Sequence, residues 1–173
     1  MSVLSYGLYL FYWLYLTWKH YRDHARDEAY PVWHALTLFV PIYGLFRTHA
    51  HARVFKELMT GRGMATTIAP GWAVGAVMIS SALDWNSFRV SLGPITQSAA
   101  IGIAVLDGIS IAIVAWLLMH LQNNLNEYWT EVSSRRFLDA RIGVGEVIFP
   151  VLGVLIWLDT FSNLFSESYR LTS

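Results

Sequence analysis

The sequence predicts an all-α protein that is integral to a membrane, and two observations predict it. The first is composition: the 173 residues are 55% hydrophobic and only 14% charged, with a mean hydropathy of +0.41. Soluble domains carry about 25% charged residues, so this chain has too little polar surface to dissolve as a monomer. The second is that the apolar residues gather into five stretches, and a membrane-spanning helix needs about 20 such residues. These stretches are residues 2–18, 31–46, 63–83, 95–119 and 144–165.

Composition also excludes several classes of protein. The formal net charge is zero, so there is no basic excess to bind the phosphates of a nucleic acid. The absence of cysteine excludes disulfides, iron–sulfur clusters and thiolate metal sites. The high hydrophobic content excludes a disordered chain. No nucleophile–base set, phosphate-binding loop or paired-carboxylate site occurs, so we expect neither enzymatic activity nor a bound cofactor.

The first stretch, residues 2–18, is uncharged and rich in tyrosine and tryptophan. It has no basic start and no small-residue cleavage site, which favours a retained membrane anchor over a signal peptide. A polar arm, residues 19–30, follows it.

The second stretch, residues 31–46, contains Pro41 and Gly44. As a straight helix it would reach about 24 Å, short of the roughly 30 Å hydrocarbon core, and the proline blocks a straight continuation. We therefore expect a re-entrant or interfacial segment, with a true crossing as the alternative. The polar arm 47–62 carries a short apolar stripe, which indicates an amphipathic segment at the membrane surface. The stripe consists of Val54, Phe55, Leu58 and Met59.

Residues 63–83, 95–119 and 144–165 are long enough to cross the membrane. After residue 119 the apolar rhythm continues at steps of three and four, so one helix should project beyond the membrane into the polar arm 120–143. That rhythm is carried by Leu118, Leu121, Leu125, Trp129 and Val132.

The basic residues favour four crossings over five. If residues 31–46 enter and leave on one side, ten of the twelve Lys and Arg lie on one face, and only Arg89 and Arg170 lie opposite. Five crossings would divide the same residues five to seven. Because basic loops are retained in the cytoplasm, we expect one membrane domain over 1–173, with the three polar arms cytoplasmic and the N-terminus outside.

The two halves of the chain also show a loose similarity. The segment Phe39-Val-Pro-Ile-Tyr-Gly44 parallels Phe149-Pro-Val-Leu-Gly153, at a similar distance from a helix with a polar extension. The pattern is typical of an internal repeat of helix, polar arm and broken helix. It predicts that the last stretch is bent or tilted like the second.

Several motifs together resemble an uncharacterised bacterial family of small multi-pass membrane proteins. They are the Tyr/Trp-rich first stretch, the Pro-x-Trp-x-Ala-Leu segment 31–36, the Pro-Ile-Tyr-Gly-Leu-Phe segment 41–46, and Gln122, Asn126 and Trp129. The resemblance covers most of the chain except the third stretch. It implies a multi-pass fold in the bacterial inner membrane, and it implies no chemistry.

Small residues recur at spacings that let membrane helices approach closely. Gly71 and Gly75 are four apart in the third stretch, and a longer ridge follows in the fourth. The ridge consists of Ala100, Ala104, Gly108 and Ala112. We expect these two stretches to pack on each other through these residues, with contact to another subunit as the alternative.

Asp107 is the most informative single residue, because an ionisable group at membrane depth costs roughly 3 kcal/mol and therefore has a partner or a pathway. A hydrogen bond to a neighbouring hydroxyl such as Ser80 or Ser81 is the simplest role. A relay for protons or cations is the functional alternative.

Four histidines are weaker candidates. His20 and His24, with Asp27 and Glu28 one turn on, have the spacing of a metal site, but the basic residues among them oppose a cation, so we expect no metal. His34 and His120 lie at or near membrane depth and have the chemistry to ligate haem or a pigment.

These observations leave three functional hypotheses open. The first is a non-catalytic membrane subunit or scaffold, embedded in lipid, that binds other membrane proteins or a copy of itself. The second is a small transporter or ion- or proton-conducting protein that uses Asp107. The third and weakest is a haem- or pigment-holding subunit.

Overall fold

The computed structural model describes residues 1–26, 28–93, 96–132 and 143–165. All regular structure in these residues is helical, which confirms the all-α prediction. The α-helices are α1 (Tyr9–Ala25), α2 (Pro31–Leu36), α3 (Pro41–Gly61), α4 (Pro70–Ser91), α5 (Gln97–Val132) and α6 (Val144–Phe165), and a 3₁₀ helix, η1 (Thr37–Phe39), joins α2 to α3.

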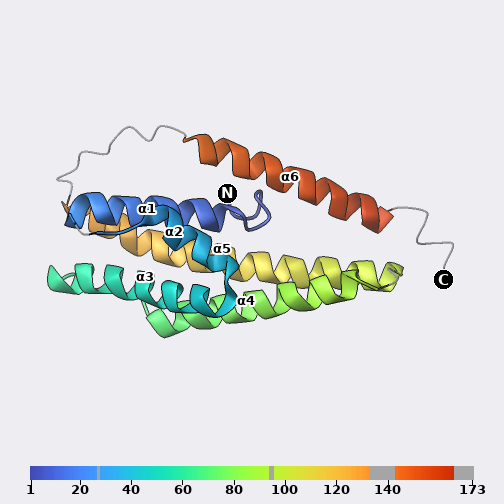
Figure 1. The fold of residues 1–173 in the computed structure, drawn as a ribbon, viewed down its shortest axis with the longest axis horizontal. Coiled ribbons are helices and arrows are strands. Elements are labelled where there is room, and N and C mark those ends of the chain that lie inside the picture. The colour runs from blue at the N-terminus through green and yellow to red at the C-terminus, as the bar shows by residue number, and fades with distance from the viewer. Residues whose placement is uncertain (27, 94–95, 133–142, 166–173) are drawn as a thin grey trace.

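The helices form an elongated bundle around α5, which runs along most of its length (Figure 1). With 36 residues, α5 is about 54 Å long. Helices α1 and α3 lie beside its C-terminal half, and α4 lies along its N-terminal half. Helix α6 lies on the side opposite α4 and has few contacts with the rest. The prediction of one continuous helix through the fourth stretch and its polar extension is confirmed up to Val132, and the rest of that arm lies outside the described residues.

One end of the bundle has a core of large side chains, contributed by α1, α3 and α5. The buried residues there include Trp13, Leu14, Trp18, Phe55, Met59, Leu121, Leu125 and Tyr128. Phe55 and Met59 belong to the stripe that we expected at the membrane surface. That expectation is wrong, because these two side chains are buried in the protein's own core.

The N-terminal stretch is helical over a shorter range than its composition suggests. Residues 2–8 form turns, and α1 begins only at Tyr9. Two consecutive residues, Tyr6 and Gly7, have left-handed backbone angles, with φ of 52° and 81°. The backbone therefore cannot continue as a right-handed helix through this point.

Residues 31–46 do not form one straight helix. Pro31 begins α2, the chain tightens into η1, Val40 is extended, and Pro41 begins α3. A residue before proline is pushed out of the helical region, while proline itself suits a first helical position, so Pro41 ends one helix and starts the next. Pro150 behaves differently, because α6 continues through it. The last stretch is therefore not broken at its proline as the second stretch is, and this part of the predicted repeat is wrong.

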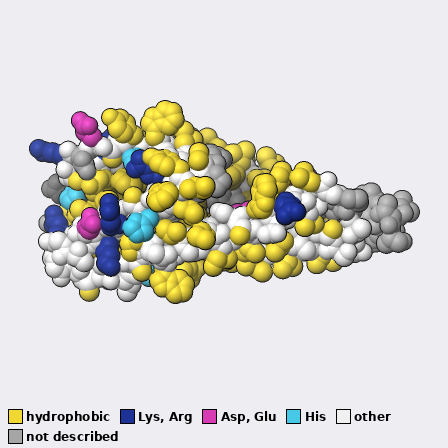
Figure 2. Space-filling view, turned by 60° about the horizontal axis from the view of Figure 1, so that its bottom comes forward, with side chains coloured by type: hydrophobic (Ala, Val, Ile, Leu, Met, Phe, Trp, Pro, Cys, Tyr) yellow, Lys and Arg dark blue, Asp and Glu magenta, His cyan; other side chains and the backbone are white. Residues whose placement is uncertain are grey.

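Two of the described helices are long and apolar enough to cross a membrane: Gln97–Val132 and residues Val144–Ser162. Large apolar side chains are exposed along α4, the N-terminal half of α5 and α6. In Figure 2, most charged and histidine side chains gather at one end of the face in view, and hydrophobic side chains cover most of the middle. Length and composition support these two spans, and the total of four crossings stays a prediction.

Candidate functional site

Asp107 has a hydrogen-bond partner from a distant part of the chain. The hydroxyl of Tyr6 donates to Oδ2 of Asp107 at 2.5 Å. The ring of Tyr6 also packs edge-on against Trp157 of α6, with centroids 5.0 Å apart. The left-handed turn at Tyr6 therefore places one phenol between α5 and α6. The prediction that Asp107 bonds a hydroxyl is confirmed, but the hydroxyl belongs to Tyr6, and Ser80 pairs with Ser110 instead.

Further polar groups from α4, α5 and α6 lie around this pair. The hydroxyls of Ser80 and Ser110 are 2.7 Å apart and both are buried. Asp84 interacts with the Ser110 hydroxyl and with the charge of Asp107, and Thr160 interacts with the Tyr6 hydroxyl. We call the whole set the polar cluster: Tyr6, Ser80, Asp84, Asp107, Ser110 and Thr160.

The polar cluster has the chemistry to exchange protons between carboxylates and hydroxyls. It lacks the composition of a metal centre, since no group of three or more His, Cys, Asp or Glu that could hold an ion occurs within the described ranges. Its hydrogen bonds join helices whose surroundings are otherwise apolar. It therefore has one evident structural role, fastening these elements together, and one chemical capacity, moving a proton.

His20 and His24 lie at the opposite end of the bundle, against aromatic rings. Nε2 of His24 is 2.8 Å from the hydroxyl of Tyr128, and both histidines pack against Trp129. Asp27, one of the two carboxylates one turn on from them, lies outside the described residues. These histidines contact side chains of α5, and the described residues around them do not make a group of three metal ligands by themselves.

His34 and His120 have separate surroundings. His34 stacks on Trp18 with centroids 4.3 Å apart, and its Nδ1 atom is buried without a hydrogen-bond partner in the described structure. His120 stacks on Trp116, and its Nε2 atom is 3.2 Å from the carbonyl oxygen of Thr67. The two histidines thus pack on different elements, and their contacts do not form a pair of facing cofactor ligands.

The most buried histidine is one that the sequence did not single out. His51 of α3 is 2% exposed and is enclosed by Trp13, Trp18 and Phe55. Its Nε2 atom is 2.8 Å from the hydroxyl of Thr17, which itself donates to the carbonyl of Trp13. The neutral imidazole with its proton on Nε2 fits this geometry. Burial lowers the pKa of His51 to about 3, so the ring is uncharged at neutral pH.

Asn124 is a second buried polar residue that sequence reasoning missed. Its Oδ1 atom accepts hydrogen bonds from the hydroxyl of Thr66 and the backbone amide of Thr67, both at 3.0 Å. Its Nδ2 atom donates to the carbonyl of His120. This one side chain therefore fastens the segment between α3 and α4 to α5. Its position three residues after Leu121, on the apolar face of the helix, is the signal that could have revealed it.

The conspicuous small residues are only partly used for packing. Ala100 is buried, whereas Gly71 is exposed, and a Cβ atom at Gly71, Gly75 or Gly108 would meet nothing within 4 Å. Ala104 is half-buried and Ala112 is exposed. Helices α4 and α5 do pack on each other as expected, but the buried α4 residues are Ala73, Ala76, Ser80 and Ser87. With respect to the described residues, the glycine face of α4 is therefore open.

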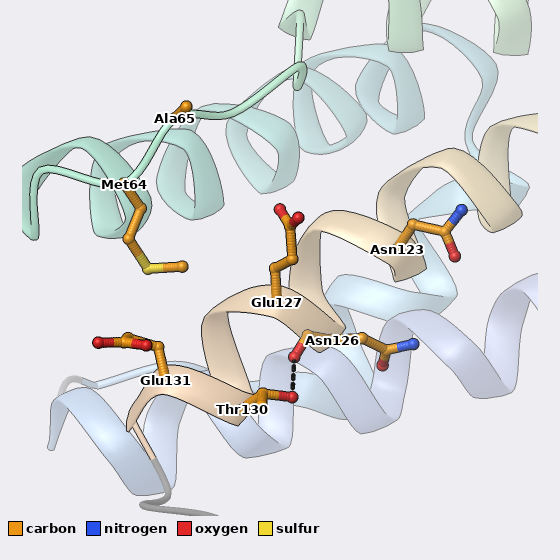
Figure 3. Close-up of a pocket in the computed structure, with 7 residues that line it drawn as sticks. All are labelled: Met64, Ala65, Asn123, Asn126, Glu127, Thr130 and Glu131. Atoms are coloured by element: carbon orange, nitrogen blue, oxygen red, sulfur yellow. Dashed lines mark hydrogen bonds between the residues drawn. The ribbon is translucent and has the colours of Figure 1, made fainter.

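A hollow of about 640 Å³ lies at the end of the bundle with the large-residue core (Figure 3). It lies between the segment after α3 and the last turns of α5, and it is lined by Met64, Ala65, Asn123, Asn126, Glu127, Thr130 and Glu131. The hollow is open and carries two carboxylates. It does not include any residue of the polar cluster.

Compared with models of known families, with curated proteins and with solved structures, the chain matches none of them. The resemblance to a bacterial membrane family therefore still depends on the motifs quoted from the sequence. The structure adds one link between those motifs: the indole nitrogen of Trp13 donates to Oε1 of Gln122 at 2.5 Å, and Gln122 in turn donates to Asn126.

Proposed function

We propose that this chain is a non-catalytic subunit of the bacterial inner membrane that associates with other membrane proteins or with a copy of itself. Four crossings by residues 2–18, α4, α5 and α6, with residues 31–46 as the re-entrant or interfacial segment, would place the polar arms in the cytoplasm. The exposed apolar side chains of α4, α5 and α6 support a lipid environment for these helices.

The observation that carries the proposal is the open glycine face of α4. Within the described residues, nothing lies within 4 Å of a Cβ atom at Gly71 or Gly75. Association of helices in lipid depends on close backbone approach, and small residues four apart permit it. A face of this kind that the described residues leave uncovered supports contact with a helix from another subunit.

Native mass spectrometry in mild detergent tests the proposal, with a variant that fills the face. We expect the wild type to retain a second subunit, and Gly75→Ile to release it because the added side chain holds the partner helix away. Ser81→Ile is the matched control, since residue 81 is exposed and lies about 120° around the same helix. A wild type that is a stable monomer without a partner would contradict the proposal, as would a Gly75→Ile variant that keeps its partner.

A second function, proton or cation conduction, is favoured by the polar cluster. Two acidic residues, Asp84 and Asp107, interact there within an apolar part of the molecule, and ionisable residues at membrane depth are commonly functional. The test is flux of protons into vesicles that contain the protein. Asp107→Asn should abolish flux while assembly persists. Wild-type vesicles that leak no faster than empty ones would exclude this function.

A further inference from the structure

The connection between α1 and α3 presents a row of large apolar side chains to the outside. We call residues 30–47 the elbow; it comprises α2, η1 and the first turns of α3. Its outward side chains include Trp33, Ile42 and Phe46, which are 69%, 74% and 67% exposed. On the other side of the elbow, Ala35 is buried and His34 stacks on Trp18. Among the residues that the structure describes, the elbow therefore packs on α1 with one side and has no partner on the other.

The elbow is a compact unit. Gly44, in the first turns of α3, lies directly against η1: a Cβ atom there would come within 3.1 Å of the Thr37 carbonyl oxygen and 3.2 Å of the Leu38 Cα atom. These contacts are with backbone atoms that cannot easily move aside. The close approach fixes η1 and the start of α3 as one shape, so their exposed apolar side chains act together.

Along the bundle, the elbow lies at the same level as part of the apolar helix α6 (Figure 1). Along the long axis in Figure 1, the turn between α2 and α3 lies within the length that α6 covers, near the beginning of α6. Helix α6 is one of the two helices long and apolar enough to cross a membrane. A bilayer that covers α6 would therefore also reach the elbow, on the side where the polar arms begin.

A cationic group lies at the edge of this apolar surface. From residue 29 to residue 46 the chain has no Lys, Arg, Asp or Glu, and Arg47 ends that run. The Arg47 guanidinium donates to the hydroxyl of Tyr43 at 2.6 Å and lies 5.1 Å from the centre of its ring. The two salt bridges found among the described residues do not involve Arg47. Tyrosine with arginine at the limit of an apolar surface is typical of the boundary between acyl chains and headgroups.

We propose that the elbow inserts as a unit into the cytoplasmic leaflet of the bilayer. Trp33, Ile42 and Phe46 lie among the acyl chains, and Arg47 lies at the level of the lipid phosphates, where it neutralises their charge. The elbow thus anchors the cytoplasmic end of the bundle at a fixed depth without crossing the membrane. This inference rests on the proposed membrane location of α4, α5 and α6.

Single-cysteine spin labelling tests the depth of the elbow directly, because the natural chain has no cysteine. Labels are placed by Ile42→Cys and Phe46→Cys in protein reconstituted into phosphatidylethanolamine–phosphatidylglycerol vesicles. Collisions with oxygen, which concentrates in lipid, are compared with collisions with a water-soluble nickel chelate. Two controls bracket the result: Glu57→Cys on the exposed side of α3, and Val105→Cys in the apolar part of α5.

We expect the labels at 42 and 46 to show high oxygen and low nickel collision rates, close to those of the label at 105 and opposite to those of the label at 57. If the label at 105 is in lipid but the labels at 42 and 46 match the one at 57, the elbow proposal alone is overturned. If the label at 105 is also in water, the membrane location fails together with it. Labels at 42 and 46 that are shielded from both reagents would show that protein covers the elbow, which also overturns insertion.

The role of Arg47 has its own measurement in the same vesicles. Arg47→Glu introduces a carboxylate that anionic phosphates repel, so the label at 46 should move toward water and its nickel collision rate should rise. Arg53→Glu is the matched control, because Arg53 is exposed six residues further along α3. An equal effect of both variants, or no effect of Arg47→Glu, would contradict a phosphate contact at Arg47.

Discussion

The two ends of the bundle bury their side chains in different ways. The first end is formed by α1, α3 and the C-terminal half of α5. There Leu125 is buried, with 1% of its surface exposed. The second end is formed by α4, the N-terminal half of α5 and α6. There Leu155 lies on the surface, with 58% of it exposed. A protein in water must cover its own apolar residues, whereas lipid covers them equally well. The contrast is what we expect if water surrounds α3 and the C-terminal half of α5, and lipid surrounds α4, the N-terminal half of α5 and α6.

The contacts between helices differ in the same way. The first end is filled by large rings, such as Trp13, Trp18 and Phe55. At the second end, α4 and α5 meet through alanines and a hydrogen-bonded pair of serines, and Gly153 of α6 lies against the backbone at Ser5. Since burial of apolar surface drives association only in water, helices in lipid depend on close approach and polar contacts.

The same substitution at the two ends should give the largest difference. We expect Leu125→Ala to lower the free energy of unfolding by about 3 kcal/mol, because it leaves a cavity in a packed core. Leu155→Ala should change it by less than about 0.5 kcal/mol, because no packed site is lost. Denaturant unfolding in detergent micelles measures both. Equal losses of unfolding free energy in the two variants would show that leucine contributes equally to stability at the two ends.

A buried polar contact at the first end should be nearly as important. Asn124→Leu keeps the size of the side chain but leaves the backbone amide of Thr67 without its partner, so we expect a loss of about 2 kcal/mol. The control is Asn126→Leu, at an exposed position two residues away, with an expected change below about 0.5 kcal/mol. Comparable losses in the two variants would mean that Asn124 does not anchor the segment between α3 and α4.

The first end should also lose stability in mild acid through His51. The pKa of His51 is lowered by burial to about 3, whereas an unfolded histidine titrates near 6.5. Below pH 6.5 the unfolded chain gains a proton that the folded chain does not, so acid favours unfolding. Between pH 7 and pH 5 this costs about 2 kcal/mol. The free energy of unfolding should fall with acid along a slope that His51→Asn reduces and that His49→Asn, at an exposed position, leaves unchanged. Part of the slope should remain in His51→Asn, because burial also lowers the pKa values of His20 and His34. A slope unchanged by His51→Asn would refute this origin.

The smallest effect should come from the polar contact of the second end. Tyr6→Phe removes the hydroxyl that donates to Asp107 and keeps the ring against Trp157. Hydrogen bonds between membrane helices contribute roughly 0.6 kcal/mol and up to 1.7, so we expect a loss of about 1 kcal/mol. Thermal unfolding in micelles measures it, and Tyr43→Phe, where the hydroxyl is on the exposed surface, is the control. A loss as large as that of Leu125→Ala would mean that the second end is held together mainly by its polar cluster.

Local patterns predicted several elements correctly. The apolar rhythm through Leu118, Leu121 and Leu125 predicted that α5 continues beyond the fourth stretch, because helical periodicity is a property of neighbouring residues. Pro41 likewise predicted that residues 31–46 do not form a straight helix. The same reasoning failed for Pro150, since nothing local distinguishes a proline that starts a helix from one that α6 tolerates.

The candidate site was predicted less completely, because its contacts are distant in sequence. Asp107 was recognised as a residue that needs a partner, but Tyr6 is 101 positions away and its approach depends on a left-handed turn before α1. The stripe at Phe55 and Met59 was recognised as apolar, but a stripe of this kind suits a lipid surface and a protein core equally. Only the packing of α1 and α5 against α3 decided between them.

By itself, then, the sequence determined the helical class and the presence of apolar helices long enough to cross a membrane, because these depend on composition and on residues a few positions apart. The tertiary structure decided which apolar faces are covered, which partner Asp107 has, and that no described residue covers the glycine face of α4 or the outer side of the elbow. Those outcomes depend on which helices pack against each other, and that depends on contacts between residues far apart in the sequence.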